Sequence, residues 1–202
     1  MWLRKAGRDT RRSTVMLGAA FAVAAGLALG GCSASYVEGD TASVLLLIES
    51  IAEGTPLLSD VRGDAGEIIN CQVNLTIVAR AKNPNGPVGI AEDVRVTGYS
   101  VAYRRSDGRG VQGLDVPYTI SGNTTILVTA GGNATAELAI DLVRHQAKLE
   151  PPLSNIVGLQ VVTMFADITV AGQTVSGKSV KASGSAQVTF ADFASGTTTC
   201  EG

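Results

Sequence analysis

Three cysteines are the residues of this chain whose positions say most about its chemistry. A thiol can be acylated, can ligate a metal or can pair in a disulfide, and its surroundings decide which of these occurs. Cys71 and Cys200 lie far apart, and neither belongs to a Cys-x-x-Cys motif or a cysteine–histidine cluster, so their spacing indicates no zinc site. Cys32 differs from both, because it directly follows an uncharged, mainly apolar stretch that ends at Gly30 and Gly31.

The segment before Cys32 has the pattern of an export signal. Residues 1–14 are basic, and the 16 residues from Val15 to Gly30 carry no charge. As a helix those residues would span about 24 Å, which is short of the roughly 30 Å core of a bilayer. We therefore expect a helical signal peptide over residues 1–31 that is removed by cleavage. We prefer the general secretory route, because Arg11-Arg12 lacks the aromatic residue that usually follows a twin-arginine pair.

The residues around Cys32 resemble the lipobox of bacterial lipoprotein precursors. The match is Leu29-Gly30-Gly31-Cys32: a leucine, two small residues and then the cysteine to be modified. The resemblance implies that the Cys32 thiol takes a diacylglyceryl group and that the chain is cleaved before this residue. Two or three acyl chains make a durable anchor where one does not, so the membrane would be a partner through acyl chains on Cys32. The alternative is an ordinary secretory leader whose cysteine is incidental.

The same resemblance implies a location in the bacterial cell envelope. Ser33, rather than an aspartate, follows the cysteine. In enteric-type lipoproteins the absence of aspartate at that position goes with transfer to the outer membrane. We therefore expect a lipid-anchored protein on the outer membrane, facing the periplasm.

Cys71 and Cys200 remain as an even pair in an oxidising compartment, which favours a disulfide between them. It would close a loop of more than 100 residues, for which the chain-entropy model gives roughly 4–5 kcal/mol of stabilisation. The alternative is that Cys71 is buried as a thiol on the apolar side of its strand and that Cys200 is unpaired.

The residues after Cys32 are predicted to fold as β-strands. Of these 171 residues, 47 are valine, isoleucine or threonine, which pack well on pleated sheets. The clearest strand, Cys71–Arg80, alternates apolar and polar residues along its length. In residues 94–105 the apolar phase changes, which predicts a β-bulge near Thr97-Gly98 and places Tyr99 and Tyr103 toward the core.

Together these patterns predict an all-β fold: an antiparallel immunoglobulin-like β-sandwich of about eight strands. Residues 55–67 are rich in turn-forming residues and are expected to cross the surface. We expect further strands at 43–51, 125–129, 134–143, 161–170 and 187–190, with one short helical turn between 144 and 156. The domains are then a signal peptide (1–31), a lipidated tether (32–42), the sandwich (43–196) and a C-terminal tail (197–202).

Two further resemblances concern the body of the chain. The segment VNLTIVARAKNPNG, Val73–Gly86, is similar to the opening of late-embryogenesis-abundant group 2 (water-stress) β-sandwich domains. The segments YRRSDGR, GLDVPY, VRHQAKLEPPL and VTFADF, between Tyr103 and Phe193, resemble uncharacterised lipoproteins of environmental bacteria. The first resemblance implies a sandwich and a protective role, and the second implies no known activity.

No group of residues has the spacing of a catalytic site. His145 is the only histidine, and no Gly-x-Ser-x-Gly elbow supplies it with a nucleophile. Glu137 and Asp141 are expected on the solvent side of one strand, and neither these two nor Glu150 indicates a cleft with two carboxylates across it. We therefore expect no catalytic residue, no metal site and no cofactor, and do not expect an enzyme.

Arg104, Arg105 and Arg109 surround an Asp-Gly turn and are the candidate partner-contact residues. Guanidinium groups match carboxylates and phosphates, so the three could bind an anion or a partner protein. The alternative is a solvated turn that protects a strand end from edge pairing.

Charge narrows the class of partner. The residues from Cys32 onward carry 11 basic and 17 acidic side chains, a formal charge of −6, which disfavours nucleic acid. Our leading hypothesis is a lipid-anchored cell-envelope protein whose non-catalytic sandwich binds or scaffolds a partner protein. The alternatives are a water-stress-type protective domain and a glycan-binding module. A glycan-binding module would need an aromatic platform, and the only tryptophan, Trp2, is in the leader.

Overall fold

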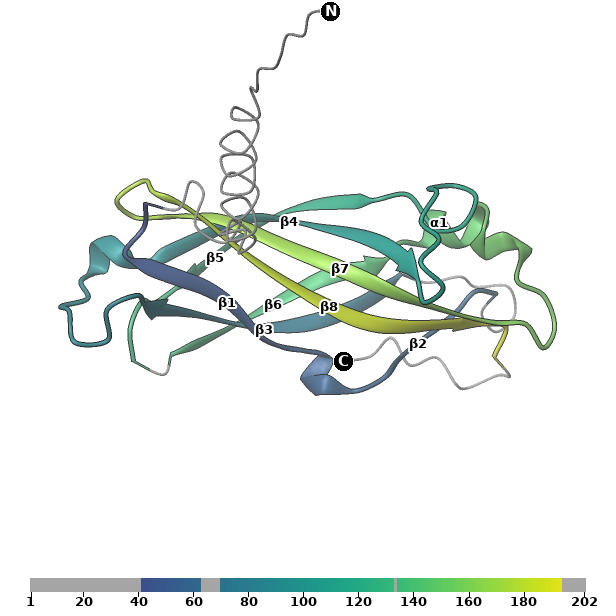
Figure 1. Ribbon diagram of the computed structural model, residues 1–202, viewed down its shortest axis with the longest axis horizontal. Coiled ribbons are helices and arrows are strands. Elements are labelled where there is room, and N and C mark those ends of the chain that lie inside the picture. The colour runs from purple at the N-terminus through teal and green to yellow at the C-terminus, as the bar shows by residue number, and fades with distance from the viewer. Residues whose placement is uncertain (1–40, 63–69, 133, 194–202) are drawn as a thin grey trace, which may run out of the picture. The chain divides into compact units, whose positions relative to one another are not determined.

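The computed structural model describes residues 41–62, 70–132 and 134–193 (Figure 1). The chain divides into two units, residues 1–39 and 40–202, and every described residue belongs to the second. That unit is mostly β, with eight strands in two sheets of three and five strands. The fold is therefore β-sandwich-like, as the alternating sequence pattern predicts.

The three-stranded sheet has the strand order β1-β3-β6, and both pairs are antiparallel. Its strands are β1 (Val44–Ile51), β3 (Cys71–Ala81) and β6 (Thr135–Val143). In each strand buried and exposed residues alternate over much of the length, so one face of the sheet is apolar. That face packs on the second sheet.

The five-stranded sheet has the order β2-β8-β7-β4-β5. Its strands are β2 (Leu57–Asp60), β4 (Val94–Arg105), β5 (Ile120–Val128), β7 (Val161–Thr174) and β8 (Ser179–Ala191). β2 pairs with β8 in parallel, while the other pairs are antiparallel. The sheet is therefore mixed.

Short helical segments connect the strands. They are η1 (Ala52–Gly54), η3 (Ile90–Glu92), α1 (His145–Leu149) and η4 (Leu153–Asn155). η1 carries the chain from β1 to β2, in the other sheet, through three successive residues with positive φ, of which only Gly54 is a glycine. Ala52 and Glu53 accept this unfavourable conformation to make the crossing. α1 confirms the helical turn predicted between residues 144 and 156.

The core lies between the two sheets and is completed by two tyrosines of β4. Tyr99 and Tyr103 are buried, as predicted, and both reach the backbone of β6. The Tyr99 hydroxyl accepts a hydrogen bond from the amide of Asp141 at 3.1 Å, and the Tyr103 hydroxyl donates to the carbonyl of Leu142. Burial raises the pKa of Tyr103 well above its ordinary value. Gly122 makes room for Tyr99, since a Cβ there would lie 2.3 Å from the ring.

The predicted β-bulge is confirmed. The register of β4 against both β5 and β7 shifts between Val96 and Gly98. A Cβ on the facing Gly172 would lie 2.5 Å from the carbonyl oxygen of Arg95, so the bulge requires a glycine on β7.

Three expectations for the body are wrong. The sheets are not wholly antiparallel, because β2 runs parallel to β8. Residues 55–67 do not simply cross the surface, since Leu57–Asp60 forms that strand and Leu57, Ser59 and Asp60 are buried. β8 is also far longer than the predicted 187–190, because its first half has small residues on the inner side and gives little alternation.

Candidate functional site

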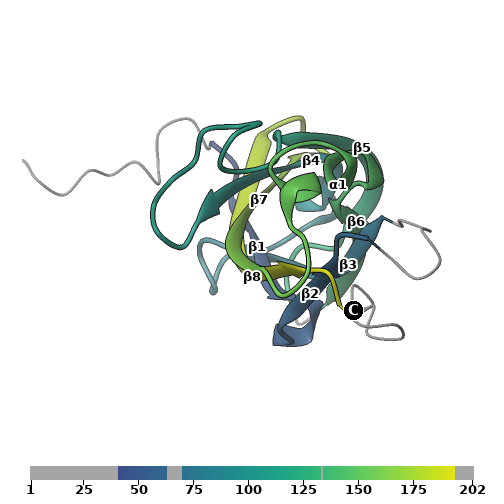
Figure 2. The ribbon, with the colours of Figure 1, turned by 90° about the vertical axis from the view of Figure 1, so that its right-hand side faces the viewer.

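The strands run between two ends that differ in their connections. The chain enters β1 at the proximal end, where Val44 pairs with Ala81 and where the β3–β4, β5–β6 and β7–β8 connections lie. The distal end holds the β4–β5 connection, residues 106–119, and the β6–β7 connection, residues 144–160. In Figure 1 the proximal end is on the left and the distal end on the right, and Figure 2 looks onto the distal end.

The predicted lipidation and cleavage residues lie outside the described residues. They are Cys32, Leu29, Gly30 and Gly31. Within residues 41–62, 70–132 and 134–193, no helix is long and apolar enough to span a bilayer. Lipid attachment at Cys32 stays a prediction.

Of the predicted disulfide pair, one member is described. Cys71 is fully buried at the start of β3, at the distal end, and its side chain is not free there. Cys200 lies outside the described residues, so the pairing stays a prediction. β8, the last described strand, ends at the same end of the sandwich.

The proximal end carries two exposed apolar side chains on adjacent connections. Ile90 is 80% exposed and Val175 is 55% exposed. Their loops are joined by backbone hydrogen bonds, from the Val175 amide to the Asp93 carbonyl at 2.8 Å and from the Ser176 amide to the Ala91 carbonyl at 2.9 Å. The two side chains therefore stand on one fixed piece of backbone.

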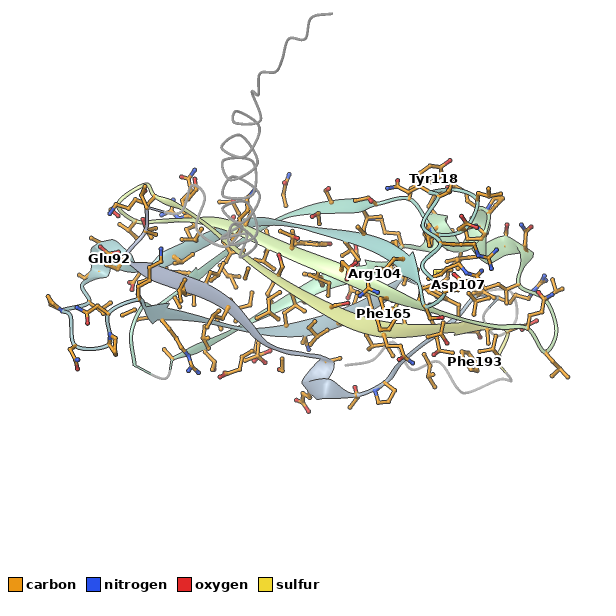
Figure 3. The ribbon with its side chains drawn as sticks, in the orientation of Figure 1. Glu92, Arg104, Asp107, Tyr118, Phe165 and Phe193 are labelled. Atoms are coloured by element: carbon orange, nitrogen blue, oxygen red, sulfur yellow. The ribbon has the colours of Figure 1, made fainter. Side chains whose placement is uncertain are left out.

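The two carboxylates of the β3–β4 connection accept hydrogen bonds from other parts of the fold. Glu92, labelled in Figure 3, accepts a hydrogen bond from the hydroxyl of Ser43. Asp93 is buried and accepts from the amide of Ala130 at 2.8 Å. Each thus fixes a connection or the start of β1, and neither faces solvent fully.

At the distal end the predicted arginine trio divides into two groups. Arg105 and Arg109 both bind the carboxylate of Asp107, with nitrogen–oxygen distances of 3.2 and 2.7 Å, and Asp115 lies 3.9 Å from Arg109. These hydrogen bonds hold the pKa of Asp107 well below its ordinary range and raise that of Arg109. Two cations and two anions neutralise one another at the turn, which agrees with the solvated-turn alternative for these two arginines.

Arg104 belongs to the outer face of the five-stranded sheet instead. Its Nε donates to Asp167 at 3.0 Å, and its guanidinium carbon lies 4.4 Å from the ring centroid of Phe165 (Figure 3). A third contact, to the hydroxyl of Ser185, is 3.5 Å long. Arg104 is therefore held along the sheet by cross-strand neighbours on β7 and β8.

The two distal connections expose a set of large apolar side chains. Val111, Leu114 and Tyr118 stand on the β4–β5 connection, and Leu149, Val157, Leu159 and Val161 stand on or next to the β6–β7 connection. Exposed fractions run from 48% at Val157 to full exposure at Leu159. Several exposed apolar side chains at one end of a domain are candidates for an interaction site, whereas single ones need no explanation. We call these seven residues the distal apolar set.

The β6–β7 connection is fastened to the sandwich beneath these residues. Leu153 of η4 is fully buried, and Arg144 donates to the carbonyl of Ser121 at 2.5 Å. Lys148 of α1 is also buried, and desolvation lowers its pKa although Asp60 acts in the opposite direction. The connection is therefore anchored, so its exposed apolar residues stand on ordered backbone.

The other polar residues considered for catalysis do not converge. His145 is exposed, and its amide donates to Asn70 at 2.7 Å. Glu137 accepts from Thr76 and Asp141 from Gln72, both on the outer face of the three-stranded sheet. Glu150 accepts a hydrogen bond from the side-chain Nε2 of Gln146 at 2.7 Å. Within the described part of the chain, no three histidine, cysteine, aspartate or glutamate residues are grouped as a metal site would need.

Sequence reasoning missed the distal apolar set, although a signal for it exists. Val111, Leu114, Val157 and Leu159 are apolar residues inside segments that carry turn residues and no strand alternation, where a solvated loop would be polar. No protein-family model, no curated protein and no solved structure matches this chain.

Proposed function

We propose that this chain is a lipid-anchored cell-envelope protein that binds a partner protein through its distal end. The observation that carries the proposal is the placement of the distal apolar set opposite the end at which the chain enters β1. An anchor on Cys32 precedes β1 by about ten residues, so a domain held in this way presents its distal end away from the bilayer. In the envelope of a bacterium with an outer membrane, that end would face the periplasm.

The chemistry of the distal end favours a protein as its partner. Arg105, Asp107, Arg109 and Asp115 neutralise one another, which leaves little net charge beside the distal apolar set. Protein interfaces have cores depleted of charge and enriched in large apolar and aromatic side chains, and Tyr118 supplies an aromatic ring that is 56% exposed. Nucleic acids and anionic surfaces select the opposite composition.

We also propose an immunoglobulin-like strand order. The order of the seven strands other than β2 supports it: the first, second and fifth form one sheet, and the fourth, third, sixth and seventh form the other. Immunoglobulin-like sandwiches place their first, second, fifth and third, sixth, seventh strands in this way, and use loops at one end for binding. The parallel strand β2 is then an addition at the edge of the second sheet.

The test is crosslinking in intact cells, followed by purification of the lipidated protein and mass spectrometry of what accompanies it. We expect one envelope protein at near-equal stoichiometry. Replacing Leu114 and Leu159 by serine should lower its recovery at least about tenfold, since such anchors dominate binding energy. Both side chains are exposed, so the double variant should fold normally.

The matched control is Leu127→Ser, which removes an exposed apolar side chain of β5 that belongs to neither the distal apolar set nor the Ile90–Val175 pair. The partner should be recovered with this variant as with the wild type. Equal recovery with the distal double variant would overturn the proposed surface, and an absence of any accompanying protein would overturn the proposed function.

A further inference from the structure

The proximal end combines exposed apolar side chains with exposed cations. Ile90 and Val175 project from its two hydrogen-bonded connections. Lys178 lies on the same turn as Val175, while Lys181 and Arg95 are exposed one or two residues into the adjoining strands. Of its described carboxylates, Asp93 is buried and accepts a hydrogen bond from the Ala130 amide, and Glu92 is partly buried and accepts one from Ser43. Glu137 is exposed two residues into β6.

The excess of exposed cations at the proximal end contrasts with the net negative charge of the domain. The residues from Cys32 onward carry a formal charge of −6. At the proximal end the exposed cations Arg95, Lys178 and Lys181 outnumber the exposed carboxylate Glu137, which is a departure from the average of the domain. Apolar side chains flanked by cations are the composition that suits the headgroup region of an anionic bilayer, where cations meet lipid phosphates and apolar groups reach the acyl chains.

Chain length restricts which end can reach the bilayer. Nine residues lie between Cys32 and Ala42, the first buried residue of the described part of the chain, so the two Cα atoms are at most roughly 35 Å apart. The 12 residues of β4 alone span roughly 40 Å along the sandwich, so the distal connections lie beyond the reach of such a tether.

We propose that the proximal end rests on the lipid surface, with Ile90 and Val175 inserted between the headgroups and Lys178 and Lys181 against lipid phosphates. This inference rests on the lipid anchor of the proposed function. The contact fixes the orientation of the sandwich, so that its distal end points away from the bilayer. The occupant of the proximal end is thus the membrane itself and not a second copy of the chain.

Tryptophan fluorescence tests the contact, because the chain's one tryptophan, Trp2, lies in the leader that cleavage removes. The full lipidated protein is reconstituted into phosphatidylethanolamine–phosphatidylglycerol vesicles with bromine on the acyl chains near the headgroups. We expect Ile90→Trp to lose about half of its emission to bromine and to shift to shorter wavelength, as a side chain at the acyl boundary does. Leu159→Trp, at a distal position that is also exposed, should lose less than about a tenth of its emission.

Charge provides the second arm of the test. In the Ile90→Trp protein, replacing Lys178 and Lys181 by glutamate should roughly halve the quenching on anionic vesicles, because lipid phosphates then repel this end. Both lysines are exposed, so the change should leave the fold intact.

The outcomes separate the inference from the anchor on which it rests. Vesicles that float with the protein while Ile90→Trp stays unquenched would keep the anchor and overturn the lipid contact. A shift to shorter wavelength without quenching would place a protein neighbour there and would also overturn it. Failure of the protein to float with vesicles would overturn the anchor and the contact together.

Discussion

The two ends of this sandwich expose apolar side chains in different electrostatic settings. At the proximal end Ile90 and Val175 stand near exposed lysines, while the neighbouring carboxylates Glu92 and Asp93 are hydrogen-bonded within the fold. At the distal end a larger apolar set stands beside a turn whose arginines are neutralised by Asp107 and Asp115. Exposed apolar area alone therefore does not identify a partner. Unpaired cations beside it favour a lipid surface, whereas charges paired with one another favour a protein surface.

The ends also differ in how their connections are built. At the proximal end the β7–β8 connection is a short turn, residues 175–178, and the longer β3–β4 connection, residues 82–93, is fixed to it by backbone hydrogen bonds between residues 91–93 and 175–176. The distal connections are long, and each has its own internal anchor: the Asp107 ion pairs in one, and Leu153 with Lys148 in the other. Long anchored connections provide the larger and more variable surface that recognition of a specific protein needs.

The largest expected effect comes from removing the anchor. Cys32→Ser should move the protein from the membrane to the soluble fraction and remove the mass of the acyl groups. The proximal contact alone, with two apolar side chains, is too weak to retain it. Fractionation and intact-mass measurement check this, and Cys200→Ser, which leaves lipidation unchanged, is the control. Retention of Cys32→Ser on the membrane would remove the basis for calling one end proximal to lipid.

The next largest effect is on the free energy of unfolding, and it should differ between a buried and an exposed leucine of the β6–β7 connection. Leu153→Ala should lower the free energy of unfolding by about 2–5 kcal/mol, because it leaves a cavity under η4. Leu159→Ala should change it by less than about 0.5 kcal/mol, because that side chain touches solvent only. Denaturant unfolding measures both, and equal losses would show that Leu159 is part of the core.

Lys148 gives a smaller, pH-dependent effect at the distal end. Because burial holds its folded-state pKa below the ordinary 10.5, the unfolded chain binds more protons between the two values. The free energy of unfolding should therefore gain a rising slope as pH approaches 10.5, and Lys148→Met should lack that slope.

At pH 7 the methionine variant avoids desolvating an ammonium group but leaves the buried Asp60 without the cation that faces it, so the pH slope is the diagnostic quantity and not the absolute stability. Tyr103, whose pKa is raised, lowers stability above pH 10 in both proteins, so it cancels in the difference. Thermal or urea unfolding from pH 7 to 10 checks the prediction. A parallel pH dependence in the two proteins would contradict it.

The smallest expected effect concerns the charged turn. Asp107→Asn should free Arg105 and Arg109, so trypsin should cut after Arg109 several-fold faster while the overall stability stays nearly unchanged. Asp115→Asn is the matched control, because its carboxylate lies 3.9 Å from Arg109 and holds it less. Equal cleavage rates in the two variants would mean that the Asp107 pairs do not order this turn.

Much of the fold could be predicted because its signals are local. Alternation along residues 71–80 predicts β3, and the phase change between Val96 and Tyr99 predicts the bulge, since side chains in a strand alternate with period two. Tyr99 and Tyr103 could be assigned to the core on the same ground.

The parts that could not be predicted depend on contacts between distant segments. β2 is four residues long and mostly buried, so it shows no alternation, and its parallel pairing with β8 depends on the crossing made by η1. In β8, Gly184 faces the other sheet, where a Cβ would lie 3.2 Å from Ile51 and 3.4 Å from Ile48. Close packing between sheets thus required a residue that weakens the strand signal.

The candidate site was also predicted only in part, because some of its contacts join residues that are far apart in the sequence. Arg105 and Arg109 meet at the predicted turn because their partner Asp107 is a sequence neighbour. Arg104 is held by Asp167, which lies 63 positions away on β7, and no local pattern announces that pair. The distal apolar set joins two connections that are far apart in sequence, so only the fold brings them to one end.

Paired photocrosslinking in intact cells tests most directly whether one end of the sandwich meets lipid and the other meets protein. A photoreactive phenylalanine analogue would replace Leu159 in one strain and Ile90 in another, both positions being at least 80% exposed. We predict a single protein adduct from position 159, and lipid adducts without a protein adduct from position 90. The same protein captured from both positions, or lipid captured from position 159, would contradict the account.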